Sequence, residues 1–210
     1  MSEKEWAKTI RDLLIKKLDP TEDKYWIEVE VPLCFNCNLN NDFRNIREED
    51  KSVRNIDIKN ANAQTWNVDL LIAEKIKVNN DIKLVPRVIL EAKYNDINLH
   101  GPITYNYNAG LHKQLYPGLK YGFIIGNYSK NINRESDISK QLISQGNNFD
   151  FIFVFNKSVL SKKEEDKFIE VIKNNIKTAR NLANFLSEKT TKDRVKNWYY
   201  IKNFEFSDYD

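Results

Sequence analysis

Residues 67–93 read NVDLLIAEKIKVNNDIKLVPRVILEAK, and this stretch decides the fold. Two runs in this region, 66–75 and 85–93, are rich in the Val, Ile and Leu side chains that favour strands. The Asn-Asn-Asp sequence between them, at 79–81, is typical of a tight turn. The two runs are therefore predicted to pair as an antiparallel hairpin.

Helices and further strands are predicted on both sides of this hairpin. Apolar residues recur at helical spacing over 3–18, where Ser2 and Glu5 form a capping box, and side chains alternate over 25–31 as in a half-buried strand. The other predicted elements are helices over 104–116, 138–143 and 161–188, strands buried on both faces over 120–126 and 149–155, and a final strand over 198–206. This order predicts one α/β domain over 1–210, with a central mixed sheet of four to five strands flanked by helices.

Composition limits the class of protein. The chain has 210 residues, of which 41% are hydrophobic, which fits a folded domain and not a disordered chain. A net charge of +3 permits nucleic-acid binding without requiring it. The two cysteines, Cys34 and Cys37, lack the further ligands of a zinc site and are expected to be ordinary thiols. Low cysteine usage and the absence of a signal peptide or membrane span predict a soluble, cytoplasmic protein, and the abundance of Lys, Asn and Ile suggests a bacterial or phage genome.

Ionised residues occur where the predicted hairpin should be apolar. Asp69 lies in the run NVDLLI, and Glu91 and Lys93 follow the apolar residues 88–90. Such groups are costly to bury unless they are paired or bind a metal ion. The two-residue period of a strand places Glu91 and Lys93 on one face, so Asp69 on the neighbouring strand can meet them there. Two carboxylates and the main-chain carbonyl of Ala92 are ligands suited to Mg²⁺, beside which Lys93 could orient or deprotonate a water molecule, or stabilise developing charge on a phosphate.

This pattern resembles the PD-(D/E)XK nuclease superfamily, which includes type II restriction endonucleases and the nuclease domains of type I restriction subunits. The resemblance covers roughly residues 1–126 and rests on Asp69, on the Glu91-Ala92-Lys93 tripeptide and on the helix-strand-hairpin-helix-strand order. It implies a restriction-endonuclease-like core, with Asp69 and Glu91 as ligands of Mg²⁺ (Mn²⁺ is expected to substitute) and Lys93 as the residue that activates water. Val68 stands where the family's name has Pro.

Members of the superfamily often add an acidic residue from the first helix. Glu5 is the candidate here, although its place in the capping box explains it equally well. Glu28 and Glu30 in the following strand are alternatives for the same role.

Polar residues of the 104–116 helix are candidates for contact with the scissile phosphate or its water. We select Gln114 as a catalytic candidate and Lys113 as a nucleic-acid contact, with His112 as a possible proton relay. A solvated helix face would explain each of these residues equally simply.

Two polar stretches, 34–64 and 127–148, are expected to be recognition loops. Arg and Asn side chains suit base edges, and Lys suits phosphates, although a solvated loop would have the same composition. The candidate contacts are Arg44, Arg47 and Arg54 in the first stretch and Lys130 and Arg134 in the second.

These features together predict a Mg²⁺-dependent endonuclease acting on double-stranded DNA, in the form of a site-specific type II restriction enzyme that works as a homodimer. The alternatives are a repair, phage or RNA nuclease on the same fold, or a nucleic-acid-binding module without turnover. A non-nuclease α/β enzyme has no support, because neither a phosphate-binding glycine loop nor a Ser-His-Asp arrangement occurs in the sequence.

Overall fold

The structure is a computed structural model that describes residues 1–18, 24–36, 64–78, 81–95, 97, 100–116, 118–128 and 137–187. The predicted order of helices and strands is confirmed within these residues, while the strand expected over 198–206 lies outside them. In chain order the elements are α1 (Glu3–Leu18), β1 (Tyr25–Asn36), β2 (Gln64–Val78), β3 (Asp81–Tyr94), α4 (His100–Leu115), β4 (Lys120–Gly126), α5 (Asp137–Gln145), β5 (Phe151–Val154) and α6 (Lys162–Ser187).

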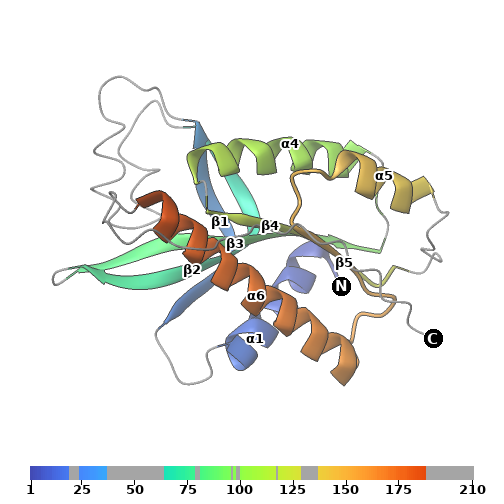
Figure 1. Cartoon of the computed structure of the whole chain (residues 1–210). Coiled ribbons are helices and arrows are strands. Elements are labelled where there is room, and N and C mark those ends of the chain that lie inside the picture. Colours follow the sequence, from blue (N-terminus) through green and yellow to red (C-terminus); the bar gives the residue numbers. More distant parts are fainter. Residues whose placement is uncertain are drawn as a thin grey trace, which may run out of the picture.

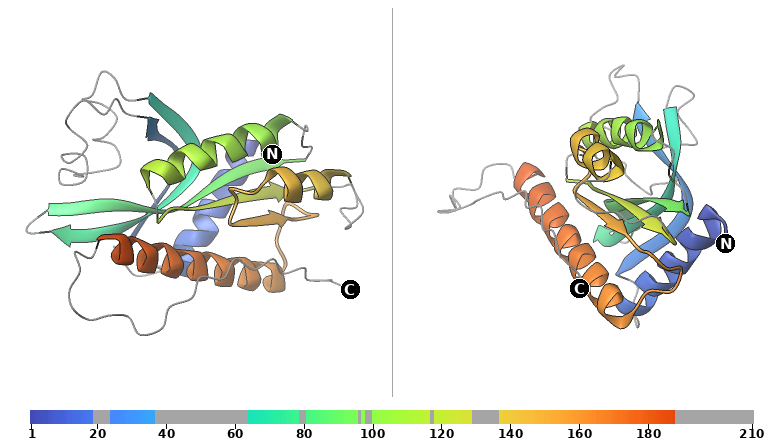
Figure 2. Two further views of the ribbon diagram at one scale, coloured as in Figure 1. Left: turned by 45° about the horizontal axis from the view of Figure 1, so that its top comes forward. Right: turned by 90° about the vertical axis from the view of Figure 1, so that its right-hand side faces the viewer.

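A mixed sheet of five strands forms the centre of the described part of the chain, which confirms the α/β class. The strand order is β1-β2-β3-β4-β5, with the first three strands antiparallel and the last three parallel. The connections through α4 and α5 lie on the same face of the sheet (Figures 1 and 2). This is the arrangement that right-handed crossovers give when the strand order advances in one direction.

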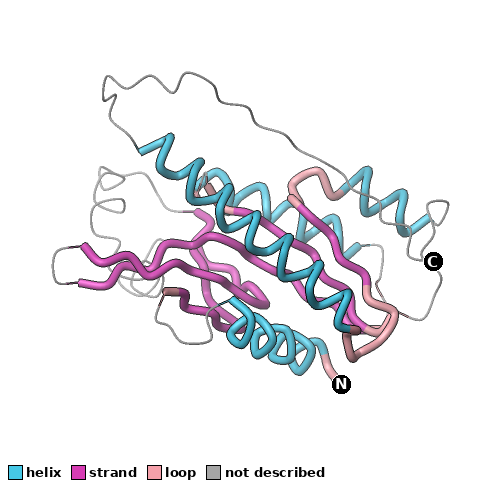
Figure 3. The backbone as a smooth tube through the Cα atoms, turned by 60° about the horizontal axis from the view of Figure 1, so that its bottom comes forward, coloured by secondary structure: helices cyan, strands magenta, loops and turns pink. Residues whose placement is uncertain are grey.

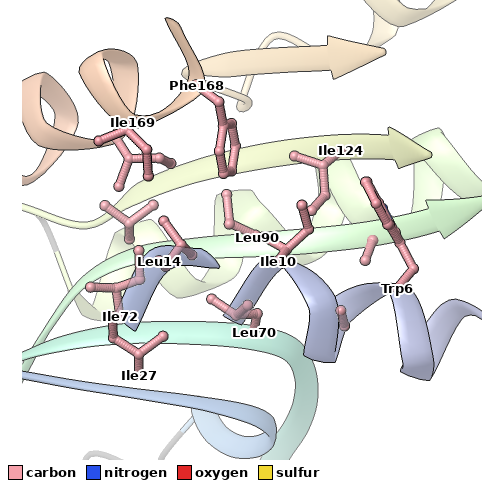
Figure 4. Packing of buried hydrophobic residues seen from close by; sticks show 14 of the residues in the cluster. Trp6, Ile10, Leu14, Ile27, Leu70, Ile72, Leu90, Ile124, Phe168 and Ile169 are labelled. Atoms are coloured by element: carbon pink, nitrogen blue, oxygen red, sulfur yellow. The ribbon is translucent and has the colours of Figure 1, made fainter. Parts of the chain in front are cut away.

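Helices cover both faces of the sheet and create two cores. On one face, α1 and α6 pack against the strands, and Trp6, Ile10 and Leu14 form the buried stripe of α1 (Figure 4). This stripe confirms the helical spacing read from the sequence. On the other face, α4 and α5 cover a second cluster that includes Leu33, Val68 and Phe123. No helix in the described ranges combines the length and apolar character needed to cross a bilayer.

The paired strands β2 and β3 extend beyond the rest of the sheet as a long arm (Figure 3). Their ends pair as Val78 with Asp81, so the predicted antiparallel hairpin is confirmed, while residues 79 and 80 of the expected turn lie outside the described residues.

Two predictions about individual strands were wrong. The strand expected over 149–155 is β5, which is half-buried because it lies at the edge of the sheet and not between two strands. Val31 does not share a face with Ile27: it belongs to the core under α4, whereas Ile27 belongs to the core under α1. Glu30 between them has a φ of 52°, and the paired strand β2 changes core at the same place, since Leu70 lies in the core under α1 and Val68 in the core under α4.

The polar stretch expected to begin at residue 34 begins later. β1 continues to Asn36, and Cys34 is a buried free thiol within it. Cys37 and most of the expected recognition loop lie outside the described residues.

Candidate active site

A bulge in β3 sets the register that brings Asp69 and Glu91 together. From the turn inward the hairpin pairs regularly as far as Ala73 with Pro86, but the next pair is Ile72 with Val88. Arg87 is therefore an extra residue on β3. Beyond it, Leu70 pairs with Leu90, and the same register sets Asp69 opposite Glu91. Without the bulge Asp69 would face Leu90, and its side chain would lie on the opposite face from Glu91.

Ion pairs hold the bulge in place. The Arg87 side chain is buried and its Nε donates to Glu74 Oε2 at 2.9 Å. Arg180 of α6 binds the same carboxylate, and its Nη2 lies 2.7 Å from Glu74 Oε1. Burial opposes the charge on Glu74, but the two guanidinium groups outweigh it and lower the pKa of that carboxyl. Glu74 is thus a paired structural carboxylate that fixes the backbone next to the site.

The Asp69 and Glu91 carboxyl groups interact directly with each other. Glu91 is fully buried, and its Oε2 has no hydrogen-bond partner among these residues. Burial, followed by the adjacent Asp69 charge, raises the pKa of Glu91 well above its usual value. Burial also raises the pKa of Asp69, although the N–H of Ala92 donates to Asp69 Oδ2 at 2.8 Å and opposes this rise. The pair therefore favours an added proton or cation.

Tyr121 of β4 positions the Glu91 carboxylate. Its hydroxyl donates to Glu91 Oε1 at 2.5 Å. Burial and the Glu91 charge raise the pKa of Tyr121 well above its usual value, so the hydroxyl keeps its proton and remains a donor. One oxygen of Glu91 is thereby fixed, and the other is left for a ligand.

Lys93 lies at the same site and is held by two other elements. Its Nζ donates to Glu3 Oε2 of α1 at 2.7 Å and lies 4.8 Å from the ring centre of Tyr105 of α4. Burial opposes its charge, but the hydrogen bonds to Glu3 and Tyr105 outweigh this and raise the pKa of Lys93. Lys93 is thus an ammonium group. Its charge partly opposes the rise that burial causes in the pKa values of Asp69 and Glu91.

The acidic residue that α1 brings to the site is Glu3, which is not among the residues predicted from the sequence. Glu5 is in the capping box, with the N–H of Glu5 donating to Ser2 Oγ and the Ser2 nitrogen donating to Glu5 Oε2. Of the strand alternatives, Glu28 pairs with Arg11 and Glu30 with Lys4, both on α1. Helical spacing held the signal for Glu3, because it precedes the buried Trp6 by three residues and shares its face, whereas Glu5 does not.

The polar residues selected on α4 lie apart from the carboxyl pair. Gln114 is exposed, and Lys113 pairs with Asp150 at 2.7 Å, beside the start of β5. His112 is buried and stacks on Tyr121, with 5.9 Å between ring centres. Burial lowers the pKa of His112 to about 4, although a hydrogen bond with the Leu33 backbone opposes this decrease. His112 therefore supports Tyr121 as a neutral ring.

A surface pocket of about 480 Å³ opens onto the two carboxylates. Residues near the start of β2 and Tyr105 of α4 contribute to its lining. Asp69 and Glu91 were predicted from the sequence, whereas the other four lining residues were not. Three of these four lie just before Asp69 on β2, and only Tyr105 needed folding to bring it to the site. The lining residues are Thr65, Trp66, Asn67, Asp69, Glu91 and Tyr105.

The donor set fits a hard divalent cation with an incomplete protein shell. In the part of the chain that the structure describes, no group of three His, Cys, Asp or Glu side chains converges as a metal site. Mg²⁺ commonly takes only one or two carboxylates and completes its shell with water and substrate phosphate. The free Oε2 of Glu91 and the adjacent Asp69 carboxyl supply such a pair. Ligation by the Ala92 carbonyl remains a prediction.

The five basic residues assigned to nucleic-acid contacts, Arg44, Arg47, Arg54, Lys130 and Arg134, lie outside the described residues. Comparison with known proteins adds no assignment: no protein-family model matches the chain, and no curated protein matches its sequence.

Proposed function

We propose that this chain is a divalent-metal-dependent nuclease that hydrolyses phosphodiester bonds in nucleic acid. The observation that carries this proposal is the pairing of the buried Glu91 with the half-buried Asp69 in the lining of a surface pocket, with Lys93 beside them. A protein retains such a costly pair when a cation is to be bound there. The resemblance to PD-(D/E)XK nucleases, which rests on the same three residues, supports the same reaction.

Asp69 and Glu91 would hold Mg²⁺ through the side-chain oxygens that face each other. When bound there, Mg²⁺ would polarise a phosphate oxygen and lower the pKa of water. Tyr121 keeps Glu91 in one orientation, which limits the reorganisation needed on metal binding.

Lys93 acts in this proposal as a charged donor. Because its pKa is raised, it is suited to orient the attacking water and to stabilise negative charge that develops on the phosphate. Glu3 and the Tyr105 ring fix the position of the ammonium group from two sides. The alternative role as a general base is disfavoured, since a base must first lose the proton that these contacts stabilise.

The finer form of the proposal is a type II restriction endonuclease that acts on double-stranded DNA as a homodimer. It is supported by the family resemblance and by the polar composition of 34–64 and 127–148.

The test is incubation of the purified full chain with long mixed-sequence duplex DNA, single-stranded DNA and RNA, each with Mg²⁺ and with EDTA. We expect Mg²⁺-dependent cleavage of at least one substrate. Asp69→Ala, Glu91→Ala and Lys93→Ala should each lower the rate by at least about 100-fold and leave binding largely intact. Discrete fragments from duplex DNA would favour the restriction enzyme.

Asp166→Asn provides the matched control, because Asp166 is an exposed carboxylate of α6 outside the pocket. This variant should cut at the wild-type rate. The proposal is wrong if no substrate is cut, or if Lys93→Ala retains near-normal turnover.

A further inference from the structure

Trp66 is unusually exposed for its position in the sheet. It pairs with Leu33 of β1 and precedes Val68 by two residues, and both neighbours are fully buried in the core under α4. Trp66 nevertheless retains 39% of its surface exposed and lines the pocket over Asp69 and Glu91. What sets Trp66 apart from the other exposed apolar residues is its place in the lining of the pocket, where its ring is available to a ligand of that pocket.

The pocket combines surfaces of three chemical kinds. Its lining includes an exposed aromatic residue, Trp66, two residues with hydrogen-bonding side chains, Thr65 and Asn67, and the two carboxyl residues that would hold a cation. Tyr105 is a fixed wall of the pocket, because Lys93 lies against its ring and Phe123 packs beside it. A volume of about 480 Å³ lies within the range of pockets that bind small organic ligands.

A nucleotide matches all three kinds, through its base face, its base edge and its phosphate. In a duplex the base faces are covered by stacking on their neighbours, so an aromatic platform cannot reach them. A single strand offers its bases to such a platform whatever their sequence. The exposed Trp66 therefore favours a substrate that arrives unstacked.

We infer that the pocket takes an unstacked nucleotide of a single-stranded nucleic acid, with Trp66 as the stacking platform next to the scissile phosphate. This inference rests on the proposed nuclease function and narrows its substrate class. It departs from the double-stranded DNA expected from the family resemblance.

The test measures binding separately from cleavage. Fluorescence anisotropy of the full chain with labelled single-stranded DNA, single-stranded RNA and duplex DNA of one sequence would be recorded with Ca²⁺ and with EDTA. We expect single strands to bind more tightly than the duplex. Trp66→Ala should weaken single-strand binding by about tenfold, within the range for loss of one stacked base, while Trp66→Phe should retain most of the affinity. Comparison of the affinities for single-stranded DNA and single-stranded RNA would show whether the site prefers deoxyribose or ribose.

Tyr107→Ala is the matched control, since Tyr107 is an aromatic residue of α4 that is 66% exposed and does not line the pocket. Its affinity should equal that of the wild type, and circular dichroism would verify the fold of every variant. Equal or tighter binding of duplex DNA by the wild type, or unchanged single-strand binding by a folded Trp66→Ala protein, would overturn the inference. Trp66-dependent binding without Mg²⁺-dependent cleavage would instead refute the nuclease and leave the stacking site standing.

Discussion

Replacement of Glu91 by Gln should stabilise the metal-free protein, although Glu91 belongs to the candidate active site. The wild-type protein holds two carboxyl groups together, and Oε2 of Glu91 has no hydrogen-bond donor in the described residues. Gln has nearly the same shape and can still accept the bond from Tyr121. Its amide nitrogen can in addition donate to Asp69 at any pH, whereas the two carboxyl groups of the wild type repel each other once both are ionised.

The size of this gain follows from the bond that is added. A hydrogen bond to a charged group contributes about 1.5–3 kcal/mol to stability. For a chain of 210 residues, this corresponds to a rise in Tm of roughly 3–12 °C.

The gain should depend on pH in a defined direction. The pKa of Glu91 is raised in the folded protein, so the wild type is relatively most stable at low pH, where the pair carries a proton. As the pH rises through the folded pKa of Glu91, the wild type loses stability, whereas the Glu91→Gln variant has no proton to lose at this position. The difference in Tm should therefore be larger at pH 8 than at pH 5.

The assay is thermal unfolding followed by circular dichroism in EDTA, then in Mg²⁺. Mg²⁺ should stabilise the wild type, by about 2.7 kcal/mol at 100 times its Kd, and should have little effect on Glu91→Gln. A Glu91→Gln protein that melts below the wild type in EDTA at pH 8 would refute the reasoning.

Glu74→Gln is the matched comparison, because it makes the same substitution at another buried glutamate. Glu74 binds Arg87 and Arg180, so its loss leaves the buried Arg87 guanidinium without its carboxylate. We expect destabilisation by about 3–5 kcal/mol. The two substitutions should therefore change Tm in opposite directions.

Three further outcomes are expected. Tyr121→Phe should lower Mg²⁺ affinity or turnover by about 10–100-fold, measured by metal titration and initial rates, because it frees the Glu91 carboxylate. Glu3→Gln should reduce cleavage several-fold, because it weakens the contact that positions Lys93, whereas Glu5→Gln should leave cleavage unchanged, since Gln can keep the capping box with Ser2; equal rates would contradict this division. Because the folded protein holds His112 neutral and lowers its pKa to about 4, the free energy of unfolding should fall by up to about 3 kcal/mol as the pH drops from 6.5 to about 4. Denaturant unfolding measures this loss. The His112→Phe variant should not show it.

The sequence was sufficient for features that depend on local pattern. The helix over 3–18, the antiparallel pairing of β2 with β3 and the buried strand over 120–126 all follow from periodicity and turn chemistry, and all are present. The same local reasoning failed after Glu30, since Val31 belongs to the core under α4 whereas Ile27 belongs to the core under α1, and simple alternation does not reveal this change.

Only part of the candidate site could be predicted from local sequence pattern. Asp69, Glu91 and Lys93 stand out because charge is rare within apolar strands. Glu3, Tyr105 and Trp66 do not stand out, because their importance comes from contacts between α1, α4 and the sheet.

The chain pattern determines that β2 and β3 form a hairpin, but it does not determine that Asp69 faces Glu91. Regular pairing from the turn would have set Asp69 opposite Leu90. The bulge at Arg87 corrects the register by one residue, and its side chain is held by Glu74 and, through the same carboxylate, by Arg180 of α6. Arg180 follows Arg87 by more than 90 positions, so that constraint exists only once α6 packs on the sheet. The local sequence pattern shows which residues can carry the chemistry. Whether these residues come together depends on the register of the strands, and the register is set by the packed structure.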